Sequence, residues 1–352
     1  HVLKGQCEHV VYQAHEWMTG LGALYIQKHV PEVATIFTTH ATTIGRSIAG
    51  NHKPLYEYLF AYNGNQMAQE LNVQSKLSIE RETAHHVDCF TTVSEVTNRE
   101  GAELLDKPAD VVLMNGFEKD FVPSKALFAR KRREARRKLR EVAGALLGTE
   151  FDDDVMIIST SGRYEFRNKG IDLYMEAMNR SLRNKDLTRK VLAFVQVPGW
   201  VCCPREDLKE RLASGRDCGT PLEWPLLTHW LHEMSHDQVI DYMKRYNMWN
   251  LPDDKVKVIF VPCYLDGADG IFNMHYYDLL IGMDLTVYAS YYEPWGYTPL
   301  ESVAFHVPCV TTNLSGFGLW VNQLLGKEGE LVDGVQVVRR TDYNSSEVAD
   351  TI

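Results

Sequence analysis

Two carboxylates, Glu293 and Glu301, lie eight positions apart around a turn that is followed by a helical pattern. Residues 285–289 form an apolar run typical of a buried strand, and Glu-Pro-Trp-Gly at 293–296 ends it. Thr-Pro-Leu-Glu at 298–301 has the pattern of a capping box, with Thr298 as the N-cap residue. The alternative is an ordinary capped helix in which Glu301 closes the box and Glu293 is a solvated turn residue.

A strand that ends in such a turn directs the free amides of the next helix toward the carboxyl edge of a parallel sheet. Anionic ligands bind at that edge in open α/β folds. We therefore expect Tyr297, Thr298 and the amides beside them to hold a phosphate group.

A second loop, residues 162–170, joins an apolar run to a helical pattern at 171–182 and carries Arg163 and Lys169. An Arg fork and a mobile Lys charge at a helix N-terminus suit a diphosphate that gains negative charge as it leaves. By itself, this spacing is far more typical of surface salt bridges.

The sequence His232-Glu233-Met-Ser-His236 matches the H-E-x-x-H pattern of zinc hydrolases on a segment that we predict to be helical, and His229 extends the same helical face. Two His residues and a Glu could bind zinc and activate water only with a third ligand and an open coordination position. No familiar third ligand follows, so a zinc hydrolase is a remote alternative.

Basic residues are concentrated between residues 130 and 140. Apolar residues recur there at helical spacing: Phe128, Ala135, Leu139, Val142 and Leu146. This pattern predicts an amphipathic helix with a solvated basic face rather than a nucleic-acid arm.

The chain has 352 residues, 45% hydrophobic and 24% charged, which is typical of a globular protein with more than one core. A net charge of -10 argues against binding to nucleic acid or to an anionic membrane. No apolar run approaches membrane-spanning length.

Seven cysteines without CxxC spacing argue against a disulfide framework or a structural zinc site, and favour a reducing, cytoplasmic location. The chain does not begin with Met, so we expect a fragment of a longer protein.

Apolar runs alternate with amphipathic segments as in parallel βαβ units. The predicted strands cover residues 10–13, 35–39, 89–93, 111–114, 155–160, 192–197, 256–261, 285–289, 309–312 and 335–338. Asn115-Gly116 is a turn signal after the fourth of these. We place a domain boundary near Glu118, which divides the chain into residues 1–118 and 119–352. A polar stretch at about residues 200–250 is too long for an ordinary connection and predicts an insertion.

Four segments of the chain together resemble the animal and fungal glycogen synthase family. They are Ala-His-Glu-Trp at 14–17, Phe-Thr-Thr-His-Ala-Thr-Thr-Ile-Gly-Arg at 37–46, Gly-Arg-Tyr-Glu-Phe-Arg-Asn-Lys-Gly at 162–170, and Tyr-Tyr-Glu-Pro-Trp-Gly-Tyr-Thr-Pro at 291–299 with Asn-Leu-Ser-Gly-Phe-Gly at 313–318. The resemblance implies an α/β fold with two Rossmann-like domains facing across a cleft, the first of them incomplete. It also implies a helical insertion at 200–250 that is used in subunit association, and hence a homo-oligomer.

The resemblance also assigns residue roles in the second domain. It implies that Arg163 and Lys169 bind the donor diphosphate, that Glu293 contacts the transferring sugar and that Glu301 contacts the nucleotide ribose. Tyr276 matches a tyrosine that stacks on uracil, although it also fits a helix packed on the sheet.

In the first domain, the resemblance places His15 beside the transferring sugar and Arg46 beside the phosphates. Ala14 replaces a residue that is usually aromatic in the family. Asn115 lies in a family turn at the domain crossover, where either a hinge or an ordinary turn is expected.

The implied reaction is transfer of glucose from UDP-glucose to the non-reducing end of an α-1,4-glucan, with retention of configuration and with no metal or cofactor. The leaving phosphate would accept the proton of the acceptor hydroxyl on the same face of the sugar, so Glu293 and Glu301 are not a hydrolase pair. Two alternatives stay open: a related sugar-nucleotide transferase with another acceptor, and a non-catalytic fragment that binds nucleotide or glucan.

Overall fold

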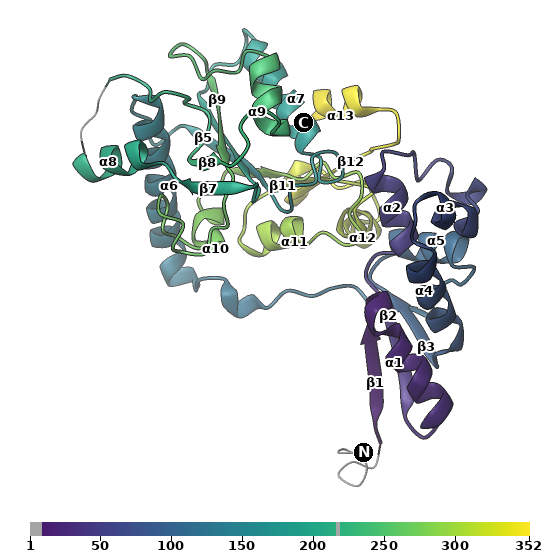
Figure 1. The fold of residues 1–352 in the computed structure, drawn as a ribbon. Coiled ribbons are helices and arrows are strands. Elements are labelled where there is room, and N and C mark those ends of the chain that lie inside the picture. The colour runs from purple at the N-terminus through teal and green to yellow at the C-terminus, as the bar shows by residue number, and fades with distance from the viewer. Residues whose placement is uncertain (1–8, 216–218) are drawn as a thin grey trace.

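The computed structural model describes residues 9–215 and 219–352, which form two α/β units, each built around its own parallel sheet (Figure 1). The first sheet has the order β1-β2-β3-β4, formed by Val11–His15, Ala34–Thr39, Cys89–Thr92 and Val111–Val112. Phe37 pairs with Ala14 on one side and Phe90 on the other. All three are buried at the centre of this unit.

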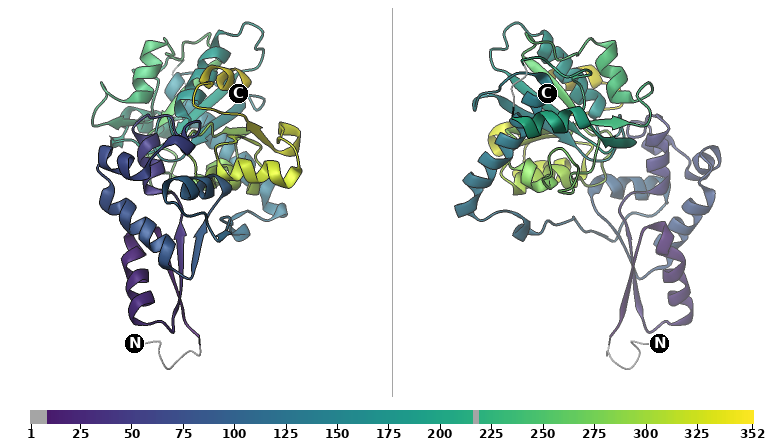
Figure 2. Two further views of the ribbon diagram at one scale, coloured as in Figure 1. Left: turned by 90° about the vertical axis from the view of Figure 1, so that its right-hand side faces the viewer. Right: turned by 60° about the vertical axis from the view of Figure 1, so that its left-hand side comes forward.

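Five α-helices and a short 3-10 helix accompany this sheet: α1 (Glu16–His29), α2 (Thr43–Gly50), η1 (Leu59–Ala61), α3 (Gly64–Glu70), α4 (Gln74–His86) and α5 (Glu95–Leu104). Figure 2 shows the unit as an elongated body whose strands begin at the end that lies far from the second unit. The opposite end, where β2 and β3 finish and α2 and α5 begin, lies against the second unit (Figure 2).

The second sheet has six parallel strands in the order β12-β11-β10-β5-β6-β9. They are β5 (Met156–Ser161), β6 (Val191–Gln196), β9 (Val256–Val261), β10 (Leu285–Val287), β11 (Cys309–Thr312) and β12 (Val335–Val338). Every residue of β6 and β9 is buried, as expected for strands covered on both faces. β9 is the last strand in this order, and Leu227 pairs with its Phe260 in an isolated parallel bridge. The accompanying helices are α6 (Lys125–Leu147), α7 (Ile171–Arg183), α10 (Tyr276–Leu280), α11 (Tyr297–Ala304), α12 (Gly316–Leu325) and α13 (Ser345–Thr351), with η3 at Leu331–Asp333.

All ten strands predicted from the sequence are present, with differences of one or two residues at most ends. The predicted amphipathic helix is α6, and its apolar stripe is buried against the second sheet. The basic face of α6 is partly used internally, because Arg132 and Arg136 donate to Asp284 at 2.7 and 2.8 Å. Within the described residues, no helix combines the length and the apolarity needed to cross a membrane.

The connection between the two sheets is extended rather than turned (Figure 1). The turn predicted at Asn115-Gly116 is wrong: residues 113–118 have no assigned turn, and the next element is the 3-10 helix η2 (Lys119–Phe121). The segment is fixed instead by aromatic contacts, since Phe117 and Phe121 pack on Tyr277. The expected boundary near Glu118 falls within this connection.

The described part of the insertion contains two short strands as well as two helices: β7 (Val201–Pro204), α8 (Glu206–Ser214), β8 (His229–Leu231) and α9 (Gln238–Arg245). The helix predicted across the H-E-x-x-H pattern is wrong. His229 lies in β8, and the His232 amide donates to the Trp200 carbonyl at 3.0 Å, which extends the pairing of β7 and β8. Helix α9 begins only after Asp237, whose carboxylate accepts from the Ile240 amide.

Candidate functional site

Two loops at the carboxyl edge of the second sheet are joined by backbone hydrogen bonds. The carbonyl of Asn168, in the loop after β5, accepts from the amides of Tyr291 and Tyr292 at 2.9 and 3.1 Å. Gly170 makes this approach possible: its φ is +71°, and a β-carbon there would lie 2.0 Å from the Ala289 carbonyl oxygen. The close contact of the loops places Lys169 beside the Glu293 loop.

The result is an ion pair between residues that are 124 positions apart in the chain. Lys169 Nζ lies 2.6 Å from Glu293 Oε2, and the side chains are only 12% and 13% exposed. Ser290 Oγ contacts the same carboxylate oxygen at 3.4 Å. A largely desolvated carboxylate with its own counter-ion is rigidly oriented, which is what positioning a reacting sugar requires.

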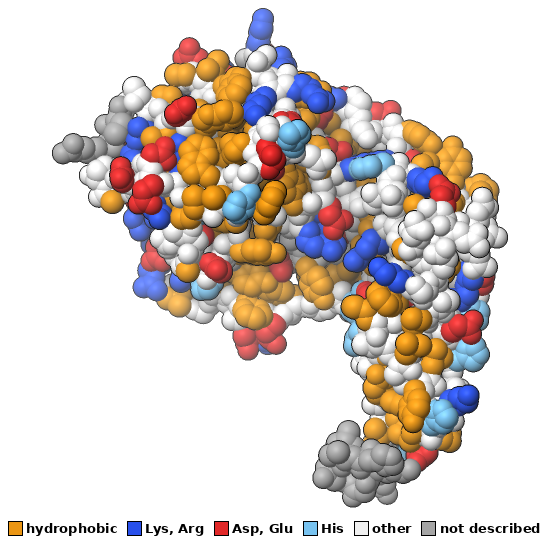
Figure 3. All heavy atoms as spheres, in the orientation of Figure 1, with side chains coloured by type: hydrophobic (Ala, Val, Ile, Leu, Met, Phe, Trp, Pro, Cys, Tyr) orange, Lys and Arg blue, Asp and Glu red, His pale blue; other side chains and the backbone are white. Residues whose placement is uncertain are grey.

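A cavity of about 330 Å³ opens over this ion pair, between the two units. Seven of the residues singled out from the sequence line it: Arg46, Asn115, Arg163, Lys169, Glu293, Tyr297 and Thr298. The first two come from the first unit or the connection, and the others come from the second. Figure 3 shows Lys and Arg side chains gathered on both sides of the hollow between the units.

The charge balance of this cavity favours an anion. Three cations, Arg46, Arg163 and Lys169, face one carboxylate, Glu293. Arg163 is 57% exposed and pairs with Glu165 at 3.0 Å, a surface contact that is easily exchanged for a ligand. The lining therefore suits a diphosphate beside a neutral sugar.

Helix α11 begins at this cavity, but not as the capping-box pattern predicts. The N-cap residue is Gly296, with φ of +109°, and Tyr297 and Thr298 already belong to the helix. Glu301 does not fold back to cap it, because its Oε1 accepts from the Tyr277 hydroxyl at 2.9 Å. The first amides of α11 keep no side-chain cap, and the positive end of the helix lies at the cavity.

A second cavity, of about 420 Å³, shares Ser161, Gly162, Arg163 and Thr298 with the first. Tyr276 lines it and is half-buried, with its hydroxyl 2.8 Å from Ser161 Oγ. Glu301 lines neither cavity, and burial raises the pKa of its carboxyl. The adjoining spaces give a ligand room for a flat ring near Tyr276 and for phosphates near Arg163.

His15 does not line either cavity, and His40 takes that place. The Nδ1 atom of His15 lies 2.9 Å from Nε2 of His40, so His15 is one side chain removed from the space above Glu293. Burial, and then the neighbouring His15, lower the pKa of His40. A neutral His40 faces the cavity at neutral pH.

Glu16 is a further residue that the sequence reasoning missed. Its φ is +64°, a strained conformation for a residue with a side chain, and its carboxylate accepts from the His40 amide at 3.2 Å. This contact holds the ends of β1 and β2 together. Glu16 and His40 lie inside the motifs at 14–17 and 37–46, and their place in those motifs is the sequence signal that could have identified them.

Two buried carboxylates hold α2, the helix that carries Arg46. Glu80 accepts from the Thr43 amide at 2.9 Å, and Glu100 accepts from the Thr42 hydroxyl at 2.6 Å. Burial raises the pKa of Glu80 to about 8 and that of Glu100 to about 7. Arg46 therefore lies on a helix whose first turn is held in place by side chains from α4 and α5.

The loop that carries Glu293 also joins the two units. Tyr292 donates its hydroxyl to Glu100 at 3.1 Å, and Ser94 Oγ donates to the Pro294 carbonyl at 2.5 Å. Glu293 thus lies between two anchors on the first unit and one partner, Lys169, in the second. A relative movement of the units would be felt directly at this carboxylate.

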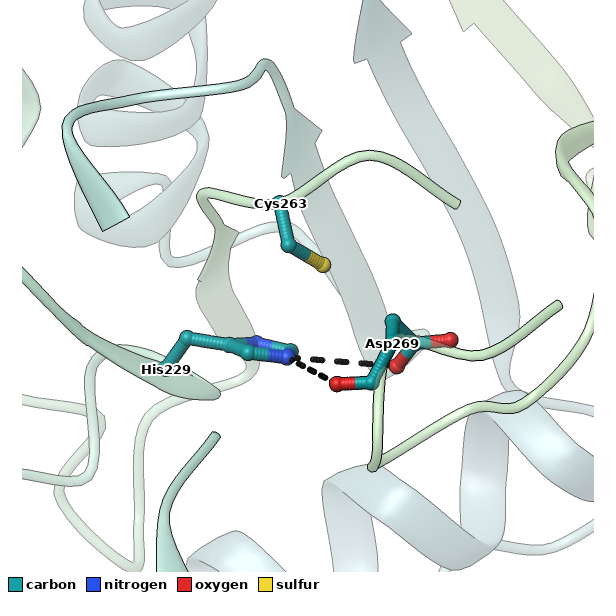
Figure 4. Close-up of side chains that lie close together, drawn as sticks. All are labelled: His229, Cys263 and Asp269. Carbon is teal, nitrogen blue, oxygen red and sulfur yellow. Dashed lines mark hydrogen bonds and ion pairs between the residues drawn. The ribbon is translucent and has the colours of Figure 1, made fainter. Parts of the chain in front are cut away.

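One trio of described residues has ligand atoms that all lie within 4.8 Å of one another: His229, Cys263 and Asp269 (Figure 4). Internal hydrogen bonds already use these atoms. His229 Nε2 donates to the Asp269 carbonyl at 2.9 Å, and the Asp269 carboxylate accepts from three amides of residues 271–273. Burial raises the pKa of Cys263 to about 12. The trio therefore has a structural role in shaping the second cavity, which Cys263 lines.

Comparison with known proteins decides the family. The glycogen synthase family model matches residues 2–204 and 205–351. The chain belongs to the glycogen synthase family.

Among relatives, it is similar to glycogen [starch] synthase of Neurospora crassa, with 30% identity over 94% of this chain. It is also similar to liver glycogen [starch] synthase of Homo sapiens, with 30% identity over 90%. It spans 54% and 52% of their lengths, about half of each. The resemblance inferred from the sequence motifs is therefore confirmed.

Solved structures confirm the predicted fold class. The catalytic domain of starch synthase IV from Arabidopsis thaliana, bound to ADP and acarbose, aligns with 99% of this chain and 66% of its own at a TM-score of 0.53 and 13% identity. Sucrose-phosphate synthase from Thermosynechococcus elongatus aligns with 99% and 65% at a TM-score of 0.51 and 16% identity. At these identities the likeness concerns the fold alone.

Proposed function

We propose that this glycogen synthase family chain carries the donor site for transfer of glucose from UDP-glucose to the non-reducing end of an α-1,4-glucan, with retention of configuration. The observation that carries the proposal is the desolvated Lys169–Glu293 pair at the base of a cationic cavity between two units. The N-terminus of α11 borders the same cavity. UDP-glucose is a substrate in this proposal, and the reaction calls for no cofactor or metal.

The groups that line the cavity have separate roles in the proposed reaction. Arg163, Lys169 and the first amides of α11 bind the diphosphate, and their hydrogen bonds strengthen as the bond between the sugar and the phosphate breaks. Glu293 faces the anomeric carbon and stabilises its growing positive charge. Arg46 approaches the phosphates from the first unit.

The departing phosphate oxygen takes the proton of the acceptor hydroxyl, and the acceptor oxygen bonds to the same face of the sugar. The neutral imidazole of His40 lies on that side of the cavity, where it can accept a hydrogen bond from a sugar hydroxyl. His15 acts through His40. The flat base lies against Tyr276 in the adjoining cavity. Assembly into a homo-oligomer and a cytoplasmic location stay predictions.

The donor site is tested by calorimetric titration of the chain with UDP, ADP and UDP-glucose. Losing the charged hydrogen bonds of Arg163 costs about 1.5 to 3 kcal/mol, so Arg163→Ala is expected to weaken UDP binding by about 10- to 100-fold. Arg130→Ala is the matched control, since Arg130 is 60% exposed and also pairs with a nearby Glu, at 3.6 Å. Equal UDP affinity in both variants would refute the assigned site.

Catalysis is tested in the full-length protein, because the chain spans about half the length of its relatives. Glu293→Gln is expected to lower glucosyl transfer to a maltooligosaccharide by about 100- to 1000-fold while leaving UDP affinity nearly unchanged. UDP binding without transfer in the unmodified full-length protein would favour the non-catalytic alternative. Transfer to a monosaccharide acceptor alone would favour a different transferase.

A further inference from the structure

Strand β7 contains an irregularity that places two adjacent cysteines on one face. Val201 pairs with Leu231, whereas Cys203 pairs with Trp230, so two steps along β7 correspond to one step along β8. Neighbouring residues of a regular strand point to opposite faces. Because Leu231 and Trp230 face opposite ways, Val201 and Cys203 do too, and the extra residue, Cys202, shares the face of Cys203.

The two thiols are accessible and close to each other. Both residues are exposed, and both are free cysteines. A hydrogen bond with the Cys202 thiol is the first cause that raises the pKa of Cys203, in agreement with two thiols that share one face. Trp230, the cross-strand partner of Cys203, has the Arg205 guanidinium 4.4 Å from its ring centroid.

The other described cysteines offer no comparable site. Cys263 and Cys309 are buried, and burial raises the pKa of each. Cys89 is half-buried, 113 positions before Cys202. Cys202 and Cys203 are therefore the accessible pair within the described part of the chain.

We propose that Cys202 and Cys203 form a vicinal dithiol site that binds thiophilic ligands, the class that includes trivalent arsenicals and soft metal ions. Two sulfur ligands on one face can chelate a single soft centre. With the hydrated form of a trivalent arsenical, which carries two hydroxyl groups on arsenic, two S–H bonds and two As–O bonds break, two As–S bonds form, and each thiol proton leaves with one hydroxyl group as water. Arsenic keeps its oxidation state, so the step needs no oxidant or reductant.

Chelation predicts much tighter binding than a single thiol gives. Once one sulfur is bound, the second is present at a high effective concentration, which is worth about 100-fold or more in affinity. The bulge supplies this proximity. Adjacent cysteines on a regular strand would point away from each other.

The probe is phenylarsine oxide, added to the reduced, folded chain and followed by intact mass under native conditions. One equivalent is expected at residues 202–203, displaced by a small dithiol but not by an equal concentration of a monothiol. Cys202→Ser and Cys203→Ser are each expected to weaken the binding of phenylarsine oxide about 100-fold, whereas Cys89→Ser leaves this binding unchanged. Unchanged binding in the Cys202→Ser/Cys203→Ser variant would overturn the proposal.

A second variant separates the bulge from simple adjacency. Cys202→Ser/Pro204→Cys again has two adjacent cysteines, now at 203 and 204, but these positions pair in regular register with Trp230 and His229 and face opposite ways. This variant is expected to bind as weakly as a single thiol. Tight dithiol-reversible binding would show that the strand register does not create the site. Thermal melting of each variant establishes that it is folded.

Discussion

Glu80→Gln gives the most direct test of the buried acids behind the candidate site. Glu80 is fully buried on α4, where it accepts hydrogen bonds from the Thr43 amide at 2.9 Å and the Thr39 hydroxyl at 3.2 Å. Burial raises the pKa of this carboxyl from 4.5 to about 8. A glutamine of the same shape keeps both contacts, because its carbonyl accepts from Thr43 and its amide donates to Thr39.

The sign of the effect follows from proton binding. Between pH 4.5 and 8 the folded chain holds a proton at Glu80 that the unfolded chain has released, so the free energy of unfolding falls as pH rises. The slope approaches about 1.4 kcal/mol per pH unit and levels off near pH 8. From pH 6 to pH 8, Glu80 therefore removes about 2 kcal/mol of stability that the glutamine variant retains.

Urea denaturation of the wild-type chain and the variant at pH 6 and pH 8 measures this difference. Glu100 titrates in both proteins, so its contribution cancels in the comparison. Glu82→Gln, an exposed change on the same helix, is the control and is expected to follow the wild-type pH dependence. A Glu80→Gln variant that loses as much stability as the wild type between the two pH values would refute the assigned titration.

Three further predictions concern the geometry of the loops and of α6. Lys169→Met leaves Glu293 largely buried without a counter-ion and is expected to cost about 3 kcal/mol at pH 7. Adding Glu293→Gln should recover part of this cost in urea denaturation, and strictly additive losses would contradict the pairing. Gly170→Ala combines a φ of +71° with a clash against backbone and is expected to cost more than about 2 kcal/mol. Gly162→Ala, at a φ of +135° in open space, should lower the melting temperature less than Gly170→Ala does. A larger drop in melting temperature for Gly162→Ala would contradict the assigned clash at Gly170. Asp284→Ala removes the shared acceptor of two arginines of α6 and is expected to cost about 2 kcal/mol in urea denaturation. A loss below about 0.5 kcal/mol would make these contacts surface pairs of little consequence.

The elements of the fold could be predicted because their signals are local. Apolar runs of five and four residues mark β6 and β9, and the 3.6-residue spacing of Ala135, Leu139, Val142 and Leu146 marks the buried stripe of α6. Burial on both faces leaves a parallel strand continuously apolar, whatever surrounds it. The motifs also named seven residues that line the first cavity.

Three local patterns predicted the wrong structure because longer-range contacts outweigh them. The Thr298 capping box is replaced by a glycine start to α11, because Glu301 bonds to Tyr277 on another helix. The His232 amide continues a strand pairing instead of beginning a helix. Asn115-Gly116 stays extended because aromatic side chains further along the connection dock on the second unit. A turn or cap contributes about 1 kcal/mol, less than the burial of one large side chain.

The sequence alone thus determined which residue types stand at the carboxyl ends of the strands, since strand ends and helix starts follow from hydrogen bonding and periodicity within a few positions. Only the tertiary structure decided which of them meet. Lys169 reaches Glu293 across 124 positions because a carbonyl of one loop accepts two amides of the other. His40 takes the place expected for His15 because Glu16 binds the His40 backbone. Desolvation, which orients the ion pair and raises the pKa values of Glu80 and Glu100, depends on segments that come together only in the folded chain.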